Sequence, residues 1–516
     1  MSFLATLKKN IEEINSLKLT ENGAIGYSTT GKKLLDMNFN VASYRRCGES
    51  EITSDFDLAR AENEVLAILW AFFVRDVRGG LGERRLFRVL FRHLIGVNPE
   101  AAAKLLPLIS EYGRWDDLIK TTVDTRLWIP AVEIIKNQLV ADQENCRAGK
   151  LISLLAKWMP SERTSSQATR KLARKLADSL GMDIKAYNRT LSTLRNYLKI
   201  VESKMSAKEW SEIDYSAVPS KANLIYNNAF LRNDEERRRA YLGALSRGEA
   251  KINAGTLFPH DVVHKYCKNG GWSCTIGTTV DPALEEMWKA LPDSKGLKNV
   301  IVVADGSGSM TTCVDNQSSV TALNIANALA IYCAERCEGE FKDKYITFSA
   351  RPKFVDFSGC NTLRDKIAMA LRYNEVANTN IEAVFQIILD TAVSNGYTQS
   401  EIPQSILIIS DMEFDSATSM GRYSYYNSDY SRETLFGSIE KKYARQGLKL
   451  PRLVFWNVAS RTKTIPIKEN DLGVTLVSGF STGIMQMVTN GQTDPYLNLV
   501  ETITGKRYQP VLDALK

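Results

Sequence analysis

The sequence is poor in cysteine, histidine and proline, and each shortage narrows the class of protein. Eight cysteines are scattered over 516 residues, at positions 47, 146, 267, 274, 313, 333, 337 and 360, which favours reduced thiols over a disulfide scaffold. None of the three histidines stands beside a candidate nucleophile, so serine-histidine hydrolysis is disfavoured. With only 14 prolines and 31 glycines, a collagen-like or low-complexity chain is excluded.

Long hydrophobic runs are also lacking. No stretch approaches the roughly 18 apolar residues of a membrane-spanning helix. The first residues, MSFLATLKKNIEEINSL, mix acidic with basic side chains and contain no cleavable apolar segment. We therefore expect a cytoplasmic protein with no membrane partner, and the length predicts more than one domain.

Positive charge is present in modest excess and is unevenly distributed. The net charge is +7, and residues 1–295 hold 44 basic against 36 acidic residues, whereas residues 296–516 hold 22 against 23. Within the first part, residues 151–200 carry ten basic and three acidic residues. This segment is a candidate anion-binding surface.

Two domains are predicted, with a boundary near residues 295 and 296. Residues 1–295 show apolar spacings of three and four, which indicate about ten short helices and resemble a helical-repeat, HEAT-like solenoid or ring. Residues 296–516 instead alternate continuous apolar strands, such as 300–304, 405–411 and 452–458, with helices. This alternation predicts an α/β doubly wound domain with a parallel sheet, whose ligands bind at the carboxyl ends of the strands.

Oxygen-bearing side chains stand at those strand ends. One strand ends in the sequence D-x-S-x-S, a later strand ends in a second aspartate, and a loop between them offers a threonine. The predicted metal ligands are Asp305, Ser307, Ser309, Thr379 and Asp411. Hydroxyl and carboxylate oxygens suit Mg²⁺, or Mn²⁺, and leave a position for an acidic ligand from a partner. The alternative is a sheet-end turn whose serines only cap the next helix.

The order of these residues resembles the von Willebrand factor A domain and its metal-ion-dependent adhesion site, over about residues 297–516. One departure is Asn380, which stands where many members of that family have an aspartate after the threonine. The resemblance implies a doubly wound fold and a divalent cation at the five residues named above.

Three segments of the first domain resemble the helical repeat module of Ro-type proteins, in a divergent branch. They are FFVRDVRGGLGER (72–84), YGRWDDL (112–118) and LAKWMPS (155–161). In that family a helical ring is closed by a von Willebrand factor A domain and binds single-stranded ends of misfolded or small structured RNAs. The resemblance implies the same architecture here, a monomeric ring, and the same class of ligand.

Basic side chains recur at helical spacing in this domain, and Arg suits phosphate through its planar fork. The predicted RNA contacts are Arg84, Arg88, Arg92, Lys157, Arg170, Lys171, Arg174, Lys175, Arg189 and Arg195. Trp158, Tyr187 and Tyr197 are candidates for stacking on bases. The alternative is that these are the solvated faces of amphipathic helices, which is the interpretation we prefer for Arg237, Arg238 and Arg239 because three acidic residues precede them.

A zinc site at His260, His264, Cys267 and Cys274 fits no common spacing, and this stretch is expected to form a linker. The sequence thus predicts a non-catalytic RNA-binding protein, part of a ribonucleoprotein. The alternative is an adaptor that uses the metal site to hold an acidic protein partner. A metal-dependent nuclease is disfavoured because serines stand where two-metal catalysis uses carboxylates.

Overall fold

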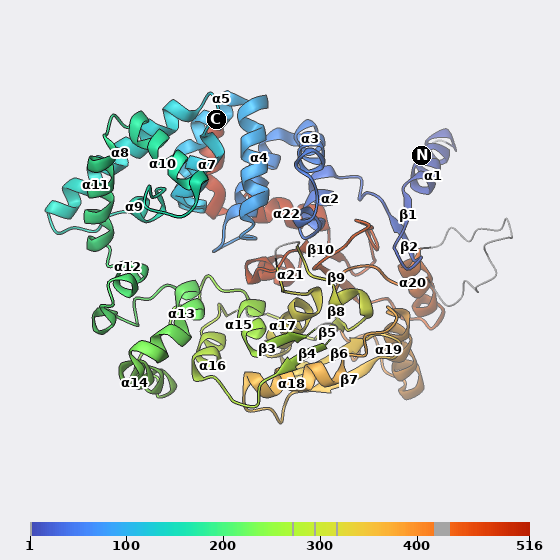
Figure 1. Cartoon of the computed structure of the whole chain (residues 1–516). Helices are drawn as coiled ribbons and strands as arrows, with labels where there is room; N and C mark the ends of the chain where they lie inside the picture. The colour runs from blue at the N-terminus through green and yellow to red at the C-terminus, as the bar shows by residue number, and fades with distance from the viewer. Residues whose placement is uncertain (1–2, 271–272, 294–295, 316–317, 417–433) are drawn as a thin grey trace. The chain divides into compact units, whose positions relative to one another are not determined.

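The computed structural model describes residues 3–270, 273–293, 296–315, 318–416 and 434–516 (Figure 1). The chain forms two compact units, each assembled from separate stretches of sequence. The first unit comprises residues 1–66 and 257–503, and the second comprises residues 67–256 and 504–516. None of the helices in the described ranges is both long and apolar enough to cross a membrane.

The first unit is built on a six-stranded mixed sheet. Its strands, in the order in which they pair, are β10 (Val474–Ser478), β9 (Arg452–Asn457), β8 (Ser405–Ser410), β5 (Val300–Asp305), β6 (Lys344–Phe348) and β7 (Lys353–Asp356). All neighbours pair in parallel except β7, which pairs antiparallel with β6. The predicted parallel strands are confirmed. The short edge strand β7 is missed because its burial pattern, with one buried residue in four, carries little hydrophobic signal.

Helices surround this sheet and are joined to it by continuous apolar packing. All 13 residues of α17 (Ala322–Ala334) are buried, because this helix packs on β5, β6 and β8 and also on α15 (Pro259–Tyr266). The remaining helices of this region are α16 (Pro282–Lys289), α18 (Leu363–Tyr373), α19 (Glu382–Asn395), α20 (Leu435–Arg445), α21 (Met485–Thr489) and α22 (Pro495–Ile503).

The N-terminal residues also belong to the sheet unit. They form α1 (Phe3–Asn15), the hairpin β1 (Leu17–Leu19) and β2 (Ile25–Tyr27), and α2 (Lys33–Phe39). Helix α2 packs on β10, and Tyr27 exchanges backbone hydrogen bonds of 2.8 Å with Ile465. The units are therefore discontinuous in sequence, whereas the sequence predicted a single division between residues 295 and 296.

The segment expected to form a linker is instead an ordered part of the sheet unit. Helix α15 buries Val262 and Val263 completely or nearly so, and it is followed by the hairpin β3 (Cys267–Gly270) and β4 (Ser273–Ile276). His260 contacts the ring of Phe480 at 5.3 Å between centroids. The side chain of Cys274 lies outside the described part, and no group of three or more His, Cys, Asp or Glu residues gathers around a metal position in the described residues.

The second unit consists of helices. Its members are the last part of α3 (Glu49–Arg75), α4 (Arg84–Val97), α5 (Pro99–Leu105), α6 (Ile109–Tyr112), α7 (Trp115–Thr122), α8 (Trp128–Arg147), α9 (Leu155–Trp158), α10 (Gln167–Ser179), α11 (Ile184–Tyr197), α12 (Val201–Ser206), α13 (Ser220–Asn233), α14 (Glu235–Ser246) and α23 (Gln509–Leu515). Helix α9 does not extend back to Ser153, because Asp142 accepts hydrogen bonds from the backbone and hydroxyl of that residue and holds it outside a helix.

The last residues of the chain return to this helical unit, and α23 packs on α5 (Figure 1). Tyr508 stacks on Tyr112 with ring centroids 5.7 Å apart. The buried carboxylate of Asp76 accepts hydrogen bonds from Arg507, at 2.8 Å from Nη2, and from the hydroxyl of Tyr508, at 3.2 Å. These contacts join the two ends of the unit's sequence.

The interpretation of Arg237, Arg238 and Arg239 as a solvated helix face is wrong for Arg238. Arg237 and Arg239 are exposed and pair with Asp234 and Glu235, as expected for a solvated face. Arg238, however, is completely buried, and its guanidinium donates to the side-chain oxygens of Asn223 and Asn227. The sequence did not show this, because the two asparagines that satisfy the charge lie on the preceding helix, α13.

Candidate functional site

The candidate site lies where the path of the chain through the sheet reverses. From the central strand β5 the chain adds β6 and β7 on one side, and then crosses to β8 on the other side. Ala304 of β5 is level with Ile409 of β8, so the carboxyl ends of these two strands bring Asp305 and Asp411 to the same edge. Open α/β sheets bind ligands at such a switch point.

The turn after β5 brings the two predicted serines next to the two carboxylates. One carboxylate oxygen of Asp305 accepts from the backbone N–H of Ser307 at 2.9 Å, and the hydroxyls of Ser307 and Ser309 lie 3.1 Å apart. The hydroxyl of Ser309 in turn donates to Asp411. Four of the five predicted ligands therefore form one connected cluster.

Gly306 is required by the tightness of this turn. A Cβ atom at this position would lie 2.9 Å from the hydroxyl of Thr347 and 3.1 Å from the side-chain oxygen of Asn374. The backbone of the turn also binds the threonine loop, because Gly306 accepts from the N–H of Val376 at 3.0 Å and Gly308 donates to the carbonyl of Ala377 at 3.0 Å. A side chain at 306 would push the two loops apart.

Thr379, the fifth predicted ligand, is buried in that loop. Its N–H donates to the carboxylate of Asp415 at 3.0 Å, and its hydroxyl accepts from the side-chain amide of Asn22 at 3.2 Å. Asn380, which departs from the family pattern, accepts from the N–H of Ala383 at 3.1 Å at the start of α19. An aspartate would be equally able to make that helix-capping contact.

Burial makes the negative charge of this cluster costly. Asp305 and Asp411 are almost inaccessible to solvent. Burial and, secondarily, the charge of Asp411 raise the pKa of Asp305 to about 7, and burial raises the pKa of Asp411 against the opposing effect of Arg461. Arg461 pairs with only one of the two carboxylates, Asp411. A cluster of two carboxylates and three hydroxyls, all of them oxygen donors, fits a hard divalent cation.

Three residues around the site were missed by the sequence analysis, and two of them, Asn22 and Arg461, complete the cluster. Asn22 bridges the hydroxyl of Thr379 and the carbonyl of Glu413, to which its amide donates at 2.6 Å. Arg461 donates to Asp411 at 3.1 Å and to Glu21 at 2.6 Å. No local motif marks these two residues, since Asn22 reaches the site through the packing of the N-terminal hairpin and Arg461 through the loop after β9.

Glu413, the third missed residue, organises the surrounding loops rather than the cluster itself. It is fully buried, and its carboxylate accepts from the backbone N–H groups of Arg461 at 2.7 Å, Thr462 at 2.8 Å and Glu21 at 2.9 Å. The loop after β9 and the N-terminal turn are thereby held beside Asp411.

The predicted RNA contacts divide into two groups. Six side chains have internal partners: Arg88 with Asp116 and Asp117, Arg174 with Glu162, Lys175 with Asp124, Lys157 with Glu202, Arg195 with the carbonyls of Ala156 and Met159, and Arg92 with the carbonyl of Lys120. The other four, Arg84, Arg170, Lys171 and Arg189, are exposed. Of the described ion pairs, none involves these four residues.

The candidate stacking residues are less accessible than expected. Tyr187 is buried and donates to the carbonyl of Pro160 at 2.8 Å. One face of Trp158 is covered by the guanidinium of Arg114, whose centre lies 3.7 Å from the ring centroid. Tyr197 remains partly exposed, although its hydroxyl donates to the carbonyl of Lys150 at 2.7 Å.

Two of the three motifs that resemble Ro-type repeats, 72–84 and 112–118, meet in a network of ion pairs. Asp117, which is completely buried, accepts from Arg75 at 2.7 Å and from Arg88 at 2.6 Å. Asp116 pairs with Arg88 and with Arg114 at 2.7 Å. These motif residues therefore serve first to join α3, α4 and α7.

Comparison with known proteins gives similarity without a described activity. A family model described as a domain of unknown function, DUF7788, matches residues 299–503, and a second, DUF2828, matches residues 182–294. The oxygen cluster from Asp305 to Asp411 lies within the first match. The chain is also 27% identical over 516 residues to "Uncharacterized protein L728" of Acanthamoeba polyphaga mimivirus, covering 92% of this chain and 85% of that protein.

Proposed function

We propose that this protein is a non-catalytic, metal-dependent binding protein of the Ro type, with a von Willebrand factor A domain in its sheet unit. The convergence of Asp305, Ser307, Ser309 and Asp411 at the switch point carries the proposal. The strand order supports the fold, because numbering the strands by their position in the chain gives 3-2-1-4-5-6, as in doubly wound domains.

In this proposal the cluster binds Mg²⁺ or Mn²⁺ through the carboxylates and the serine and threonine hydroxyls. The bound cation supplies a position for a carboxylate from an acidic protein partner. Asp305 and Asp411 neutralise the ion, while the hydroxyls of Ser307, Ser309 and Thr379 orient it. Binding rather than hydrolysis is proposed because two carboxylates match one cation, whereas two-metal catalysis needs ligands for two.

Calorimetry on the full-length protein tests the metal site. We expect Mg²⁺ and Mn²⁺ each to bind with a stoichiometry of about one and to raise the thermal midpoint, because a ligand that binds only the folded state stabilises it. The absence of both heat and thermal shift with either metal would contradict the proposed site.

A second candidate function is binding of RNA by the helical unit, at single-stranded ends of structured or misfolded small RNAs. The observation that favours it is the exposure of Arg170, Lys171 and Arg189 on α10 and α11 without an ion-pair partner in the described part of the chain. Unpaired exposed cations are available to release counterions from a phosphate backbone.

Replacement of these three residues by glutamine tests this function. We expect the variant to bind a labelled single-stranded RNA more weakly at low salt. The slope of log K against log salt should become shallower by about 2, since each lost phosphate contact removes roughly 0.7. Fluorescence anisotropy at several salt concentrations measures both quantities.

The matched control is Arg239→Gln with Arg247→Gln, because both residues are exposed but already pair with glutamates. This control should retain the wild-type slope more nearly than the test variant. Unchanged affinity and slope in the test variant would remove RNA binding by this surface and favour the adaptor function of the metal site.

A further inference from the structure

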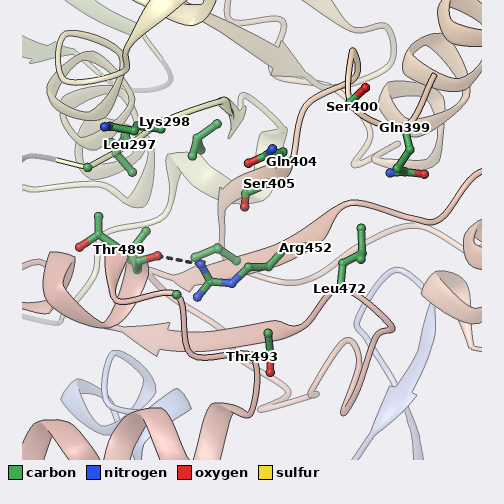
Figure 2. A pocket seen from close by; sticks show the side chains of 15 residues that line it. Leu297, Lys298, Gln399, Ser400, Gln404, Ser405, Arg452, Leu472, Thr489 and Thr493 are labelled. Carbon is green, nitrogen blue, oxygen red and sulfur yellow. Dashed lines mark hydrogen bonds between the residues drawn. The ribbon is translucent and has the colours of Figure 1, made fainter. Parts of the chain in front are cut away.

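A cavity of about 630 Å³ lies at the edge of the main sheet opposite the oxygen cluster (Figure 2). It adjoins the amino ends of β5, β8 and β9, and its lining includes Val300, Ser405 and Arg452, the first residues of these three strands. The volume is in the range of small-molecule binding sites. Because it is at the other end of the strands, its ligand is independent of the proposed metal and RNA.

The register of the sheet places these three residues side by side. Val300 pairs with Ser405, and Ser405 pairs with Arg452, so their side chains lie on one face of neighbouring strands. Next in this row is Gly473, where a Cβ atom would come within 2.7 Å of Thr493. The side chain of Arg452 therefore has a hydroxyl-bearing neighbour on one side and no side chain on the other.

The charge of Arg452 is not compensated by a carboxylate. Its guanidinium donates to the carbonyl of Val488 at 3.1 Å, the hydroxyl of Thr475 at 2.6 Å and the carbonyl of Gln492 at 3.1 Å. All three acceptors are neutral, and within the described ranges no acidic side chain lies within 4 Å of it. Its Nε is buried and has no hydrogen-bond partner. A partly buried guanidinium without a carboxylate partner favours the binding of an anion beside it.

The other residues that line the cavity also favour an anionic ligand. Among the described residues, no Asp or Glu lines the cavity. Lys298, which pairs with Glu338 at 3.8 Å, lies at its edge, and Ser400, Gln404 and Ser405 supply hydroxyl and amide donors (Figure 2). Leu297 and Leu472 add apolar surface. A phosphate group accepts hydrogen bonds from hydroxyl and amide donors and is attracted by the charge of a guanidinium, while the cavity has room for an attached organic group.

We propose that this cavity binds a small phosphorylated metabolite, with the phosphate held by Arg452. The burial that lowers the pKa of Arg452 is consistent with a charge that an anionic ligand would stabilise. The proposal does not depend on the metal site, because no residue is shared between the two.

The test uses the full-length protein with inorganic phosphate, adenosine 5′-monophosphate and uncharged adenosine as probes. Calorimetry and thermal shift should show binding of both phosphates, with the nucleotide binding more tightly than inorganic phosphate, and no comparable binding of adenosine. If neither phosphate binds, or if adenosine binds as well as its monophosphate, the proposal is overturned.

The variant Ser405→Asp introduces a carboxylate directly beside Arg452 and tests whether Arg452 holds the phosphate. We expect it to fold, to be at least as stable as wild type without ligand, and to bind both phosphates at least tenfold more weakly, because the new carboxylate competes for the guanidinium. Thr391→Asp, which adds the same charge at an exposed position of α19, is the control and should bind as wild type does. Equal affinity for phosphate in Ser405→Asp and wild type would place any bound anion elsewhere.

Discussion

The variant Asp305→Asn is expected to lose cation binding while remaining folded. Asp305 supplies one of only two carboxylates in the cluster, so its replacement halves the formal negative charge available to Mg²⁺ or Mn²⁺. We expect the affinity for either metal to fall at least roughly 100-fold, which corresponds to about 2.7 kcal/mol. Calorimetric titration of the variant measures this loss.

The fold should survive because an asparagine can form hydrogen bonds with the same two partners. Its side-chain oxygen still accepts from the N–H of Ser307, and its amide can donate to the hydroxyl oxygen of Ser410, which reverses the 2.6 Å hydrogen bond that Ser410 donates to the carboxylate in wild type. The substitution also removes a buried carboxyl group whose ionisation is unfavourable, as its pKa of about 7 indicates. The metal-free variant should therefore be at least as stable as metal-free wild type.

Asp415→Asn is the matched control for this experiment. Asp415 is a nearby, partly buried carboxylate that accepts from the N–H of Thr379, and an asparagine oxygen preserves that contact. We expect this variant to bind the cation far more tightly than Asp305→Asn. An equal loss of cation affinity in the two variants would show that the metal is attracted by the total negative charge near the cluster and not by the predicted ligands.

The variant Asp76→Ala is expected to destabilise the helical unit strongly. Asp76 is 1% exposed, and its carboxylate accepts from Arg507, from the hydroxyl of Tyr508 and from the N–H of Arg78. Removal of the carboxylate leaves a guanidinium and a hydroxyl without their partner beside the α3 to α4 turn. Loss of one member of such a pair costs about 3 kcal/mol.

Thermal unfolding followed by circular dichroism measures this effect. For a unit of this size, about 3 kcal/mol corresponds to a fall of roughly 6–12 °C in the midpoint. The control Asp513→Ala removes an exposed carboxylate from the same C-terminal segment, where it pairs with Lys516, and should change the free energy of unfolding by less than about 0.5 kcal/mol. Equal midpoints for the two variants would show that the return of the C-terminal segment contributes little.

The local features of the sheet unit were predictable from the sequence. Continuous apolar runs such as 300–304 and 405–410 are long enough to identify buried strands, and the residues that follow them must lie at the carboxyl edge. Four of the five predicted ligands depended only on that inference and on the D-x-S-x-S spacing, whereas the prediction of Thr379 depended on its position in a loop between the two strands. The structure places four of them in one connected cluster, with Thr379 in the adjoining loop.

The sequence did not predict which basic side chains are accessible to a ligand. Helical spacing puts Arg84, Arg88 and Arg92 on one stripe, but Arg88 pairs with two aspartates on α7, whereas Arg84 takes part in none of the ion pairs in the described part of the chain. Likewise, Arg195 looks solvent-exposed by its charge, yet it donates to two backbone carbonyls near α9. Periodicity shows which face a side chain occupies, and it does not show which element covers that face.

The sequence by itself determined the kinds of secondary structure, the two-part composition and the order of ligands along the sheet edge, because each of these depends on residues close together in the chain. Only the tertiary structure decided that Asn22 and Arg461 join the oxygen cluster, and that residues 504–516 belong with the helices. Those contacts join positions that are between 50 and more than 400 residues apart. They arise when packing buries complementary polar groups together, and no periodic pattern in the sequence records which groups will meet.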